Sequence, residues 1–289
     1  MNIAEIARAL HGRRNGDGYL VRCPVPNHGQ GRGDRNPSLS IVYTGEKLLV
    51  HCFAGCDSRA VLVALGHQAV DDHAVATPAP KRVTCEPNAS ALSIWRAAGP
   101  VAGTPAEKYL HSRGVTIVSA SLRFHPALDY FDGGGVVATM PAMIAAVQAP
   151  DGRVVAVQRT YLTPDGGGKA AVASPRKGLG SYQGGAVRLA AAARVLGLAE
   201  GIEDAMSAMQ MTGLPVWAAA GVGRMAGIVL PSGSAEVHIF ANNDQPGLIG
   251  ARRAVDAILA QGRRAVLRLP PSGFKDFNDV LRARASRAA

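Results

Sequence analysis

Residues 193–213 read ARVLGLAEGIEDAMSAMQMTG, which is a short apolar run, a glycine and then a helical pattern. The same alternation continues along the chain, in PVWAAAG at 215–221, EVHIFANND at 236–244, PGLIGARRAVDAILAQG at 246–262 and RRAVLRLP at 263–270. Short apolar runs that alternate with helical segments predict a parallel sheet flanked by helices. We therefore expect a C-terminal α/β domain over residues 186–289.

Acidic residues follow the apolar runs of this expected domain. Glu200 comes directly after the first run, and Asp204 lies four residues further, on the same face if a helix starts at once. Asp244 follows EVHIF, and Asp276 follows the last run. Functional groups of parallel sheets lie beyond the carboxyl ends of the strands, and carboxylates are ligands for hard cations. The sequence thus predicts a magnesium site that handles a phosphate.

A simpler interpretation of the same acids is electrostatic. Glu203, Asp204 and Asp244 all fall near expected helix N-termini, where negative charge is favourable without any ligand. For Glu203 this interpretation is the preferred one.

The N-terminal segment contains a second concentration of metal-binding residue types. Cys23 and His28 form one short-spaced pair, and Cys52 and Cys56 form another. Two such pairs separated by a longer insert are typical of a tetrahedral zinc site. Between them, SLSIVY and KLLVHCF read as the two strands of a hairpin that brings the pairs together. Four ligands without a vacancy indicate a structural ion.

Two alternatives accompany this zinc prediction. The cysteines could be buried free thiols, and His51 could replace a neighbouring ligand, although its side chain should point to the opposite face of the strand. Because nothing at the start of the chain resembles a secretory signal, a disulfide framework is disfavoured. We expect residues 1–66 to form a zinc ribbon with a short helix on each side.

Between these parts, residues 67–90 lack apolar periodicity and contain three prolines, which predicts a linker. Residues 91–185 are predicted to be a basic α+β subdomain with a hairpin around Asp151–Gly152. Arg159 lies on the second strand of that hairpin, where it could face a ligand. The PDGGGKA stretch that contains Lys169 does not have the spacing of a nucleotide-binding P-loop.

Composition adds a preference for an anionic partner. The chain has 289 residues, 47% of them hydrophobic, and a formal net charge of +10, with a sequence pI of about 9.9. Basicity spread along the whole chain is suited to nucleic acid, although it also serves solubility. No apolar stretch approaches the ~20 residues of a membrane helix, so we expect a cytoplasmic protein without a membrane partner.

Three motifs in this order resemble bacterial DnaG-type primases, which join an N-terminal zinc-binding domain to a polymerase core that contains a Toprim domain. They are CPVPNH…DRNPSLSI…HCFAGC, GLAEGIED and IFANNDQPG. The resemblance implies Glu200 and Asp244 as metal-associated acids, with Asp204 as a further acid of the cluster. It also implies Asp276 as the acid after the last Toprim strand, and Arg159 and Lys169 as nucleotide or template contacts.

The chain departs from that family in one of these motifs. The first aspartate of the family's D-x-D motif is Asn242 here. An asparagine carbonyl still coordinates a cation but brings one negative charge fewer. We therefore expect a magnesium site formed by Glu200, Asn242 and Asp244, with lowered affinity and with manganese as an alternative ion.

The function expected from this resemblance is DNA primase activity. Such an enzyme makes short RNA primers from ribonucleoside triphosphates on a single-stranded DNA template. Because the chain ends at Ala289, without room for a helicase-binding domain, we expect a compact primase of a plasmid, phage or other mobile element, with a separate replicative helicase as a candidate partner. Two alternatives are a Toprim nuclease and a non-catalytic DNA-binding replication accessory protein with a decayed metal site.

Overall fold

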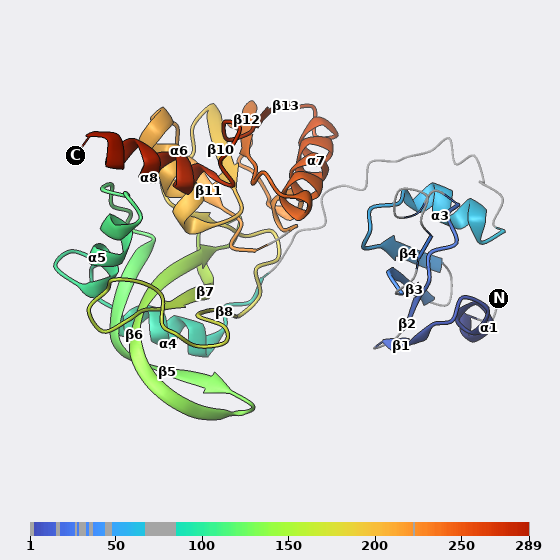
Figure 1. Ribbon diagram of the computed structural model, residues 1–289, viewed down its shortest axis with the longest axis horizontal. Helices are drawn as coiled ribbons and strands as arrows, with labels where there is room; N and C mark the ends of the chain where they lie inside the picture. Colours follow the sequence, from blue (N-terminus) through green and yellow to red (C-terminus); the bar gives the residue numbers. More distant parts are fainter. Residues whose placement is uncertain are drawn as a thin grey trace. The chain divides into compact units, whose positions relative to one another are not determined.

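The computed structural model describes residues 3–15, 18–26, 28, 33–34, 37–43, 48–66, 85–221 and 223–288. The chain divides into two compact units, Met1–Ala79 and Pro80–Ala289. Each unit has its own sheet structure and its own hydrophobic core (Figure 1). Within the described ranges, no helix has the length and apolar character needed to cross a membrane.

The N-terminal unit is built on a four-stranded antiparallel sheet whose strands pair in chain order. Its elements are α1 (Ile3–Ala9), β1 (Arg13–Asn15), β2 (Gly18–Val21), β3 (Leu39–Tyr43), β4 (Leu48–Cys52) and α3 (Ser58–Ala64). The expected hairpin is confirmed as β3 and β4, with Leu39 opposite Cys52. Its turn at 44–46 lies outside the described residues. Strand β1 was not anticipated, because it is made of exposed polar residues without an apolar pattern.

The core of this unit is small and includes cysteines. Val21, Leu39, Ile41 and Val61 are fully buried, and they pack with two buried thiol groups, those of Cys23 and Cys52. A core of this size supplies little hydrophobic stabilisation. A bound metal would therefore add a cross-link that the apolar residues cannot provide.

The first part of the second unit is another antiparallel sheet, ordered β5-β6-β7-β8. Its elements are α4 (Ala89–Ala97), α5 (Pro105–Ser112), β5 (Leu122–Asp132), β6 (Gly135–Gln148), β7 (Val154–Tyr161) and β8 (Arg176–Leu179). The hairpin expected around Asp151–Gly152 is confirmed as β6 and β7, and Gly152 has the positive φ of 89° that its turn requires. Strand β5 was not anticipated, because register shifts near His125 and Tyr130 interrupt its alternation.

The second unit begins before residue 91. The Cys85 side chain is buried and its thiol donates to the Gln183 carbonyl at 3.0 Å. The Asn88 side chain caps α4 by accepting a hydrogen bond from the backbone N–H of Ala91. The last residues of the expected linker 67–90 are therefore part of this unit, whereas residues 67–84 lie outside the described residues.

The rest of the second unit is a five-stranded sheet ordered β13-β12-β10-β11-β9. Its elements are β9 (Val187–Arg188), β10 (Val195–Ala199), α6 (Ile202–Thr212), β11 (Val216–Ala218), the 3₁₀ turn η1 (Met225–Gly227), β12 (Glu236–Phe240), α7 (Gln245–Leu259), β13 (Arg264–Arg268) and α8 (Phe277–Ala288). The strands are parallel except for β9, which runs antiparallel to β11 at the edge. The expected fold class, with its parallel sheet flanked by helices, is confirmed.

Helices cover both faces of this sheet. Val216 and Phe240 pack toward α6 and α8, whereas Trp217 and Ile239 pack toward α7 and η1. Figure 1 shows α6 and α8 on one side of β10 and α7 beyond β12 on the other. Burial on both faces explains why the strands read as continuous apolar runs rather than as alternating ones.

The two sheets of the second unit share a core. A backbone bridge joins Gln148, at the end of β6, to Ala186 just before β9. One buried cluster contains Met143 of β6 together with Ile202 and Met206 of α6. The parts expected as residues 91–185 and 186–289 therefore pack against each other within the second unit.

Candidate functional sites

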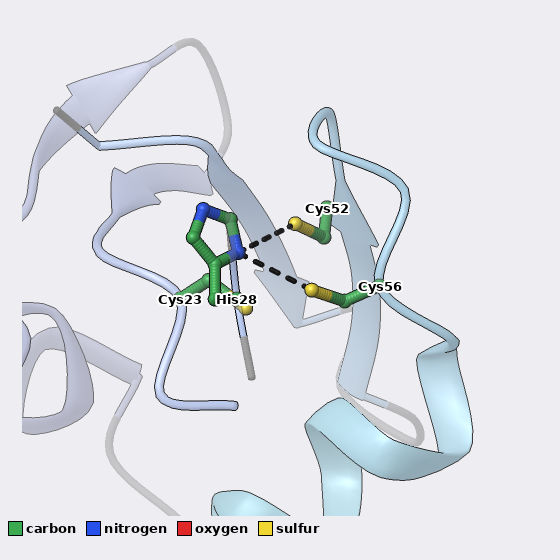
Figure 2. Close-up of side chains that lie close together, drawn as sticks. All are labelled: Cys23, His28, Cys52 and Cys56. Atoms are coloured by element: carbon green, nitrogen blue, oxygen red, sulfur yellow. Dashed lines mark hydrogen bonds between the residues drawn. The ribbon is translucent and has the colours of Figure 1, made fainter. Parts of the chain in front are cut away.

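The four residues proposed as zinc ligands come together in the N-terminal unit. Their ligand atoms, from Cys23, His28, Cys52 and Cys56, all lie within 4.8 Å of one another. The Nδ1 atom of His28 is 3.2 Å from the Cys56 sulfur and 3.6 Å from the Cys52 sulfur (Figure 2). Ligands around a tetrahedral zinc, at about 2.0–2.3 Å from the metal, are separated by roughly 3.5–3.8 Å.

The donor set also fits such an ion. Cys23, His28 and Cys52 are buried and Cys56 is half-buried, so solvent has little access. Burial raises the pKa of the Cys52 thiol, but backbone N–H groups of Cys56 and Ala54 offset this effect and lower its pKa overall. Three soft sulfurs and one imidazole are a ligand set that zinc prefers. The side chain of His51, the alternative ligand, lies outside the described residues.

A buried carboxylate orients the histidine of this cluster. One Asp34 oxygen lies 3.6 Å from Nε2 of His28, and the other accepts from the Cys23 backbone N–H at 2.6 Å. The same oxygen accepts from the Ser38 hydroxyl at 2.6 Å, and that hydroxyl lies 3.3 Å from Nε2. The ring is thereby held with Nδ1 toward the sulfurs, which is the usual second layer of a histidine metal ligand.

Asp34 was not singled out from the sequence. Burial raises the pKa of its carboxyl, but the hydrogen bonds from Ser38 and Cys23 and the nearby His28 lower it overall. The sequence shows only that Asp34 lies between the two ligand pairs. This position does not reveal that its carboxylate contacts His28, because the contact forms when the chain folds.

The second unit contains a cavity of about 340 Å³ at the carboxyl ends of its parallel strands. Five carboxylates and four cationic side chains line it, namely Glu200, Glu203, Asp204, Asp244 and Asp276 with Arg113, Lys169, Arg176 and Lys275. The structure thus places the four acids proposed as catalytic around one space, which we call the acidic cavity. Opposite charges on its walls suit a ligand that contains both a metal cation and phosphates.

Asp244 is positioned by the start of α7. One of its oxygens accepts the Gly247 N–H at 2.9 Å, and the other lies 3.5 Å from Nζ of Lys275. A Cβ atom at position 247 would lie 2.8 Å from the Asn242 carbonyl oxygen, so a glycine is needed for this close approach. The DQPG sequence therefore folds the acidic loop back onto the helix. Asp276 does the same at α8, where it accepts the Asp279 N–H at 2.8 Å.

Glu203 has a partner that the helix-terminus interpretation did not predict. Its side chain is buried, 3.0 Å from Nζ of Lys169, and it accepts a hydrogen bond from the Tyr109 hydroxyl at 2.5 Å. Burial raises the pKa of Glu203, but Lys169 and Tyr109 outweigh it and lower the pKa to about 2. Glu203 therefore anchors Lys169 beside the acidic cavity in addition to its place in the first turn of α6.

The ionised forms of Asp204 and Glu200 are disfavoured in the acidic cavity. Burial, and then the charge of Asp276, raise the pKa of Asp204 from 3.8 to about 7. Its Oδ1 accepts the Asn278 backbone N–H at 3.2 Å. Burial and the charge of Asp244 likewise raise the pKa of Glu200. A cation placed between these groups would lower their pKa values again, because an opposite charge favours the ionised form.

Two side-chain amide oxygens of the acidic cavity have no hydrogen-bond partner in the part of the chain that the structure describes. The buried Oδ1 atoms of Asn242 and Asn278 accept no hydrogen bond within the described part of the chain. The orientation of Asn278 is fixed, because its Nδ2 donates to the Arg113 carbonyl at 2.8 Å and to the Ser207 hydroxyl at 2.9 Å. Since a buried acceptor is normally satisfied, these oxygens indicate an absent donor or cation. Asn278 was missed in the sequence, although it follows Asp276 by two residues.

The acids are less tightly gathered than the N-terminal ligands. Considering the described residues alone, the Cys/His cluster is the one group of at least three His, Cys, Asp or Glu side chains assembled closely enough to hold a metal ion. The acidic cavity therefore offers oxygen ligands that would have to approach one another around a cation.

A second cavity, of about 400 Å³, lies beside the first. Arg176, Glu200 and Gly201 line both. Of the two basic residues expected to contact nucleotides or template, Lys169 lines the acidic cavity. Arg159 lines neither of the two cavities, because it is buried and its guanidinium donates to the Gly178 carbonyl at 2.9 Å. Arg176, which no motif indicated, lines both cavities.

Comparison with known families defines the class of the C-terminal part. Residues 195–287 match the Toprim domain, and residues 86–189 match a domain of unknown function, DUF7146. The chain thus contains a Toprim domain, which includes the acids at the ends of β10, β12 and β13. A comparison with curated proteins finds no match.

Among solved structures, the chain is similar to DnaG-type primases. The zinc-binding and RNA polymerase domains of the Aquifex aeolicus primase match at 13% identity and a TM-score of 0.46, over 100% of this chain and 81% of that one. The primase fragment of the bacteriophage T7 primase-helicase matches at 14% and 0.44, over 91% and 95%. A DnaG primase catalytic domain bound to single-stranded DNA matches at 14% and 0.48, over 68% and 74%.

Proposed function

We propose that this protein is a DNA primase that synthesises short RNA primers on single-stranded DNA. The observation that supports it most directly is the acidic cavity of the Toprim domain. Glu200, Asp204, Asp244 and Asp276 line it together with Asn242, whose side-chain oxygen has no partner among the described residues. Bound there by Glu200, Asn242 and Asp244, a magnesium or manganese ion would supply Lewis-acid stabilisation of the transferring phosphoryl group.

The residues of the chain provide the other requirements for nucleotidyl transfer. Arg176 and Lys275 line the acidic cavity and can hold the phosphates of a ribonucleoside triphosphate. Lys169 is kept in place by the buried Glu203 carboxylate, 3.0 Å away, so its ammonium group is positioned before substrate binds. The net charge of +10 favours contact with the template backbone.

The N-terminal unit has a separate role in this proposal. Zinc held by Cys23, His28, Cys52 and Cys56 would cross-link a unit whose apolar core is small. The unit would then help to select or position the start site on the template. The proposed protein is a compact primase of a mobile element. It would act in the cytoplasm together with a separate helicase.

A second candidate is a non-catalytic DNA-binding replication accessory protein. Asn242 and Asn278 favour it, because two positions of the acidic cavity carry neutral amides. A Toprim nuclease is the third candidate, since similar acids would support cleavage of a phosphodiester bond.

A primer-synthesis assay separates these functions. The full-length protein is incubated with single-stranded DNA, ribonucleoside triphosphates and magnesium or manganese, and the products are resolved by length. Glu200→Gln and Asp244→Asn should each abolish primers, because each removes a charged metal ligand. Asp256→Asn, an exposed position on α7, is the matched control and should retain activity. Template shortening that Glu200→Gln stops would establish the nuclease. DNA binding without either product would establish the accessory protein.

A further inference from the structure

The second cavity is lined by a buried glutamine whose amide oxygen has no hydrogen-bond partner among the described residues. Gln158, on the central strand β7, is 7% exposed and lines the cavity. Its Oε1 accepts no hydrogen bond from any residue that the structure describes. An unsatisfied buried amide lowers stability, so its presence in a packed sheet calls for an explanation. A ligand in the cavity that donates to Oε1 would supply the missing partner.

Beside Gln158, a guanidinium group and an aromatic ring form a planar surface in the cavity wall. The Arg224 guanidinium lies over the Tyr182 ring at 4.5 Å from its centroid, and both residues line the cavity. The Tyr182 hydroxyl donates to the Val157 carbonyl at 2.7 Å, which fixes the ring against the strand that carries Gln158. Nucleobases stack on aromatic rings and on guanidinium planes. The cavity thus combines a stacking surface with a hydrogen-bonding amide.

The second cavity also shares a wall with the acidic cavity. Arg176, Glu200 and Gly201 belong to the walls of both. The charged side chains of the second cavity are Arg176, Lys177, Arg224 and Glu200, so positive charge prevails there. A nucleotide with its base against Gln158 could therefore extend its phosphates past Arg176 toward the proposed metal ligands.

We propose that the second cavity is a nucleobase pocket in which the Gln158 amide reads the edge of the base. This inference rests on the proposed nucleotide-polymerising function and adds a specificity residue to it. A glutamine amide presents a donor beside an acceptor, and it makes a two-hydrogen-bond pair with an adenine edge. The base preferred by the pocket is adenine, supplied by a free nucleotide or by a DNA strand.

The test measures how binding depends on the base. The full-length protein is titrated calorimetrically, in the presence of magnesium, with ATP, GTP, CTP, UTP and inorganic tripolyphosphate. Gln158→Leu removes the amide at similar volume, and Gln158→Glu removes its donor. Gln261→Leu, at an exposed position in the turn after α7, is the matched control. Short oligo(dA) and oligo(dT) form a second arm that separates a template base from a free nucleotide.

We expect wild type to bind ATP about tenfold more tightly than tripolyphosphate or UTP. Gln158→Leu should lose that preference, keep its affinity for tripolyphosphate and melt at no lower temperature, because it removes an unsatisfied buried group. If the preference appears only between oligo(dA) and oligo(dT), the pocket serves the template strand.

Three results would overturn the inference. Equal affinity of wild type for tripolyphosphate and all four nucleotides would mean a phosphate site and would overturn the inference. A base preference that survives in Gln158→Leu, in a protein that still makes primers, would overturn the inference alone. A wild-type protein that binds neither nucleotides nor oligonucleotides and makes no primers would overturn the proposed function as well.

Discussion

Replacing Asp204 with asparagine should stabilise the Pro80–Ala289 unit at neutral and alkaline pH. The folded carboxyl takes up its proton at a higher pH than the unfolded one, because its pKa rises from 3.8 to about 7. Its unfavourable contribution is therefore absent below pH 3.8, grows as the pH rises, and becomes constant above about 7. At about 1.4 kcal/mol per pKa unit, the full effect on the free energy of unfolding is about 4 kcal/mol.

The local structure permits this substitution. Asparagine keeps the Oδ1 acceptor that receives the Asn278 backbone N–H at 3.2 Å. It removes the charge that burial and Asp276 disfavour. The stabilised variant should nevertheless lose primer synthesis if Asp204 belongs to the catalytic cluster, since active sites often carry groups that destabilise the fold.

The assay follows urea unfolding by tryptophan fluorescence without added divalent cations. The chain has two tryptophans, Trp95 and Trp217, and both lie in the second unit, so the signal reports that unit alone. The stability difference between variant and wild type should grow by about 1.4 kcal/mol per pH unit from pH 5 to 7 and then level off. Asp256→Asn, at an exposed position on α7, is the control variant. A wild type as stable as the Asp204→Asn protein at pH 8 would refute the reasoning.

Three further outcomes are expected. Asp34→Asn should weaken metal binding by the Cys/His cluster about 10- to 100-fold, measured by competition with a chromogenic chelator, because the carboxylate no longer orients His28. Lys169→Met should lower the free energy of unfolding by about 3 kcal/mol, because the buried Glu203 carboxylate loses its partner; the double variant with Glu203→Gln should recover part of that loss in the same urea assay. Asn242→Asp should tighten magnesium binding in calorimetric titrations, and unchanged affinity would show that this side chain does not contact the ion.

The sequence predicted the parts of the structure that depend on local pattern. The β3–β4 hairpin follows from two alternating runs, and its pairing brings Cys52 toward Cys23 as expected. Glu200 and Asp244 follow apolar runs that become neighbouring parallel strands, β10 and β12. Since the carboxyl ends of such strands meet at one edge, the gathering of acids follows from topology once the parallel sheet is recognised.

The parts that were not predicted depend on contacts between distant residues. Lys169 lies in the segment between β7 and β8 and Glu203 lies on α6, and no local rule pairs them. The alternation of β7 separates Gln158 from Arg159 correctly, but both faces of this strand are covered. Tertiary packing alone therefore decides that Gln158 faces the cavity and that Arg159 bonds to β8.

Compared with carboxylates at the same positions, Asn242 and Asn278 should favour the stability of the metal-free protein over its affinity for a divalent cation. Burial, and then the charge of Asp276, already raise the pKa of Asp204, so a further negative charge at position 242 or 278 would add repulsion in the metal-free protein. In the proposed metal site, Asn242 and Asn278 would each offer a neutral oxygen without adding that charge. Their attraction for a divalent cation is correspondingly weaker, because coordination by a neutral oxygen lacks the Coulomb energy of a carboxylate. If the proposed primase activity is correct, half-maximal activity of the wild type should require a higher magnesium concentration than that of the Asn242→Asp variant.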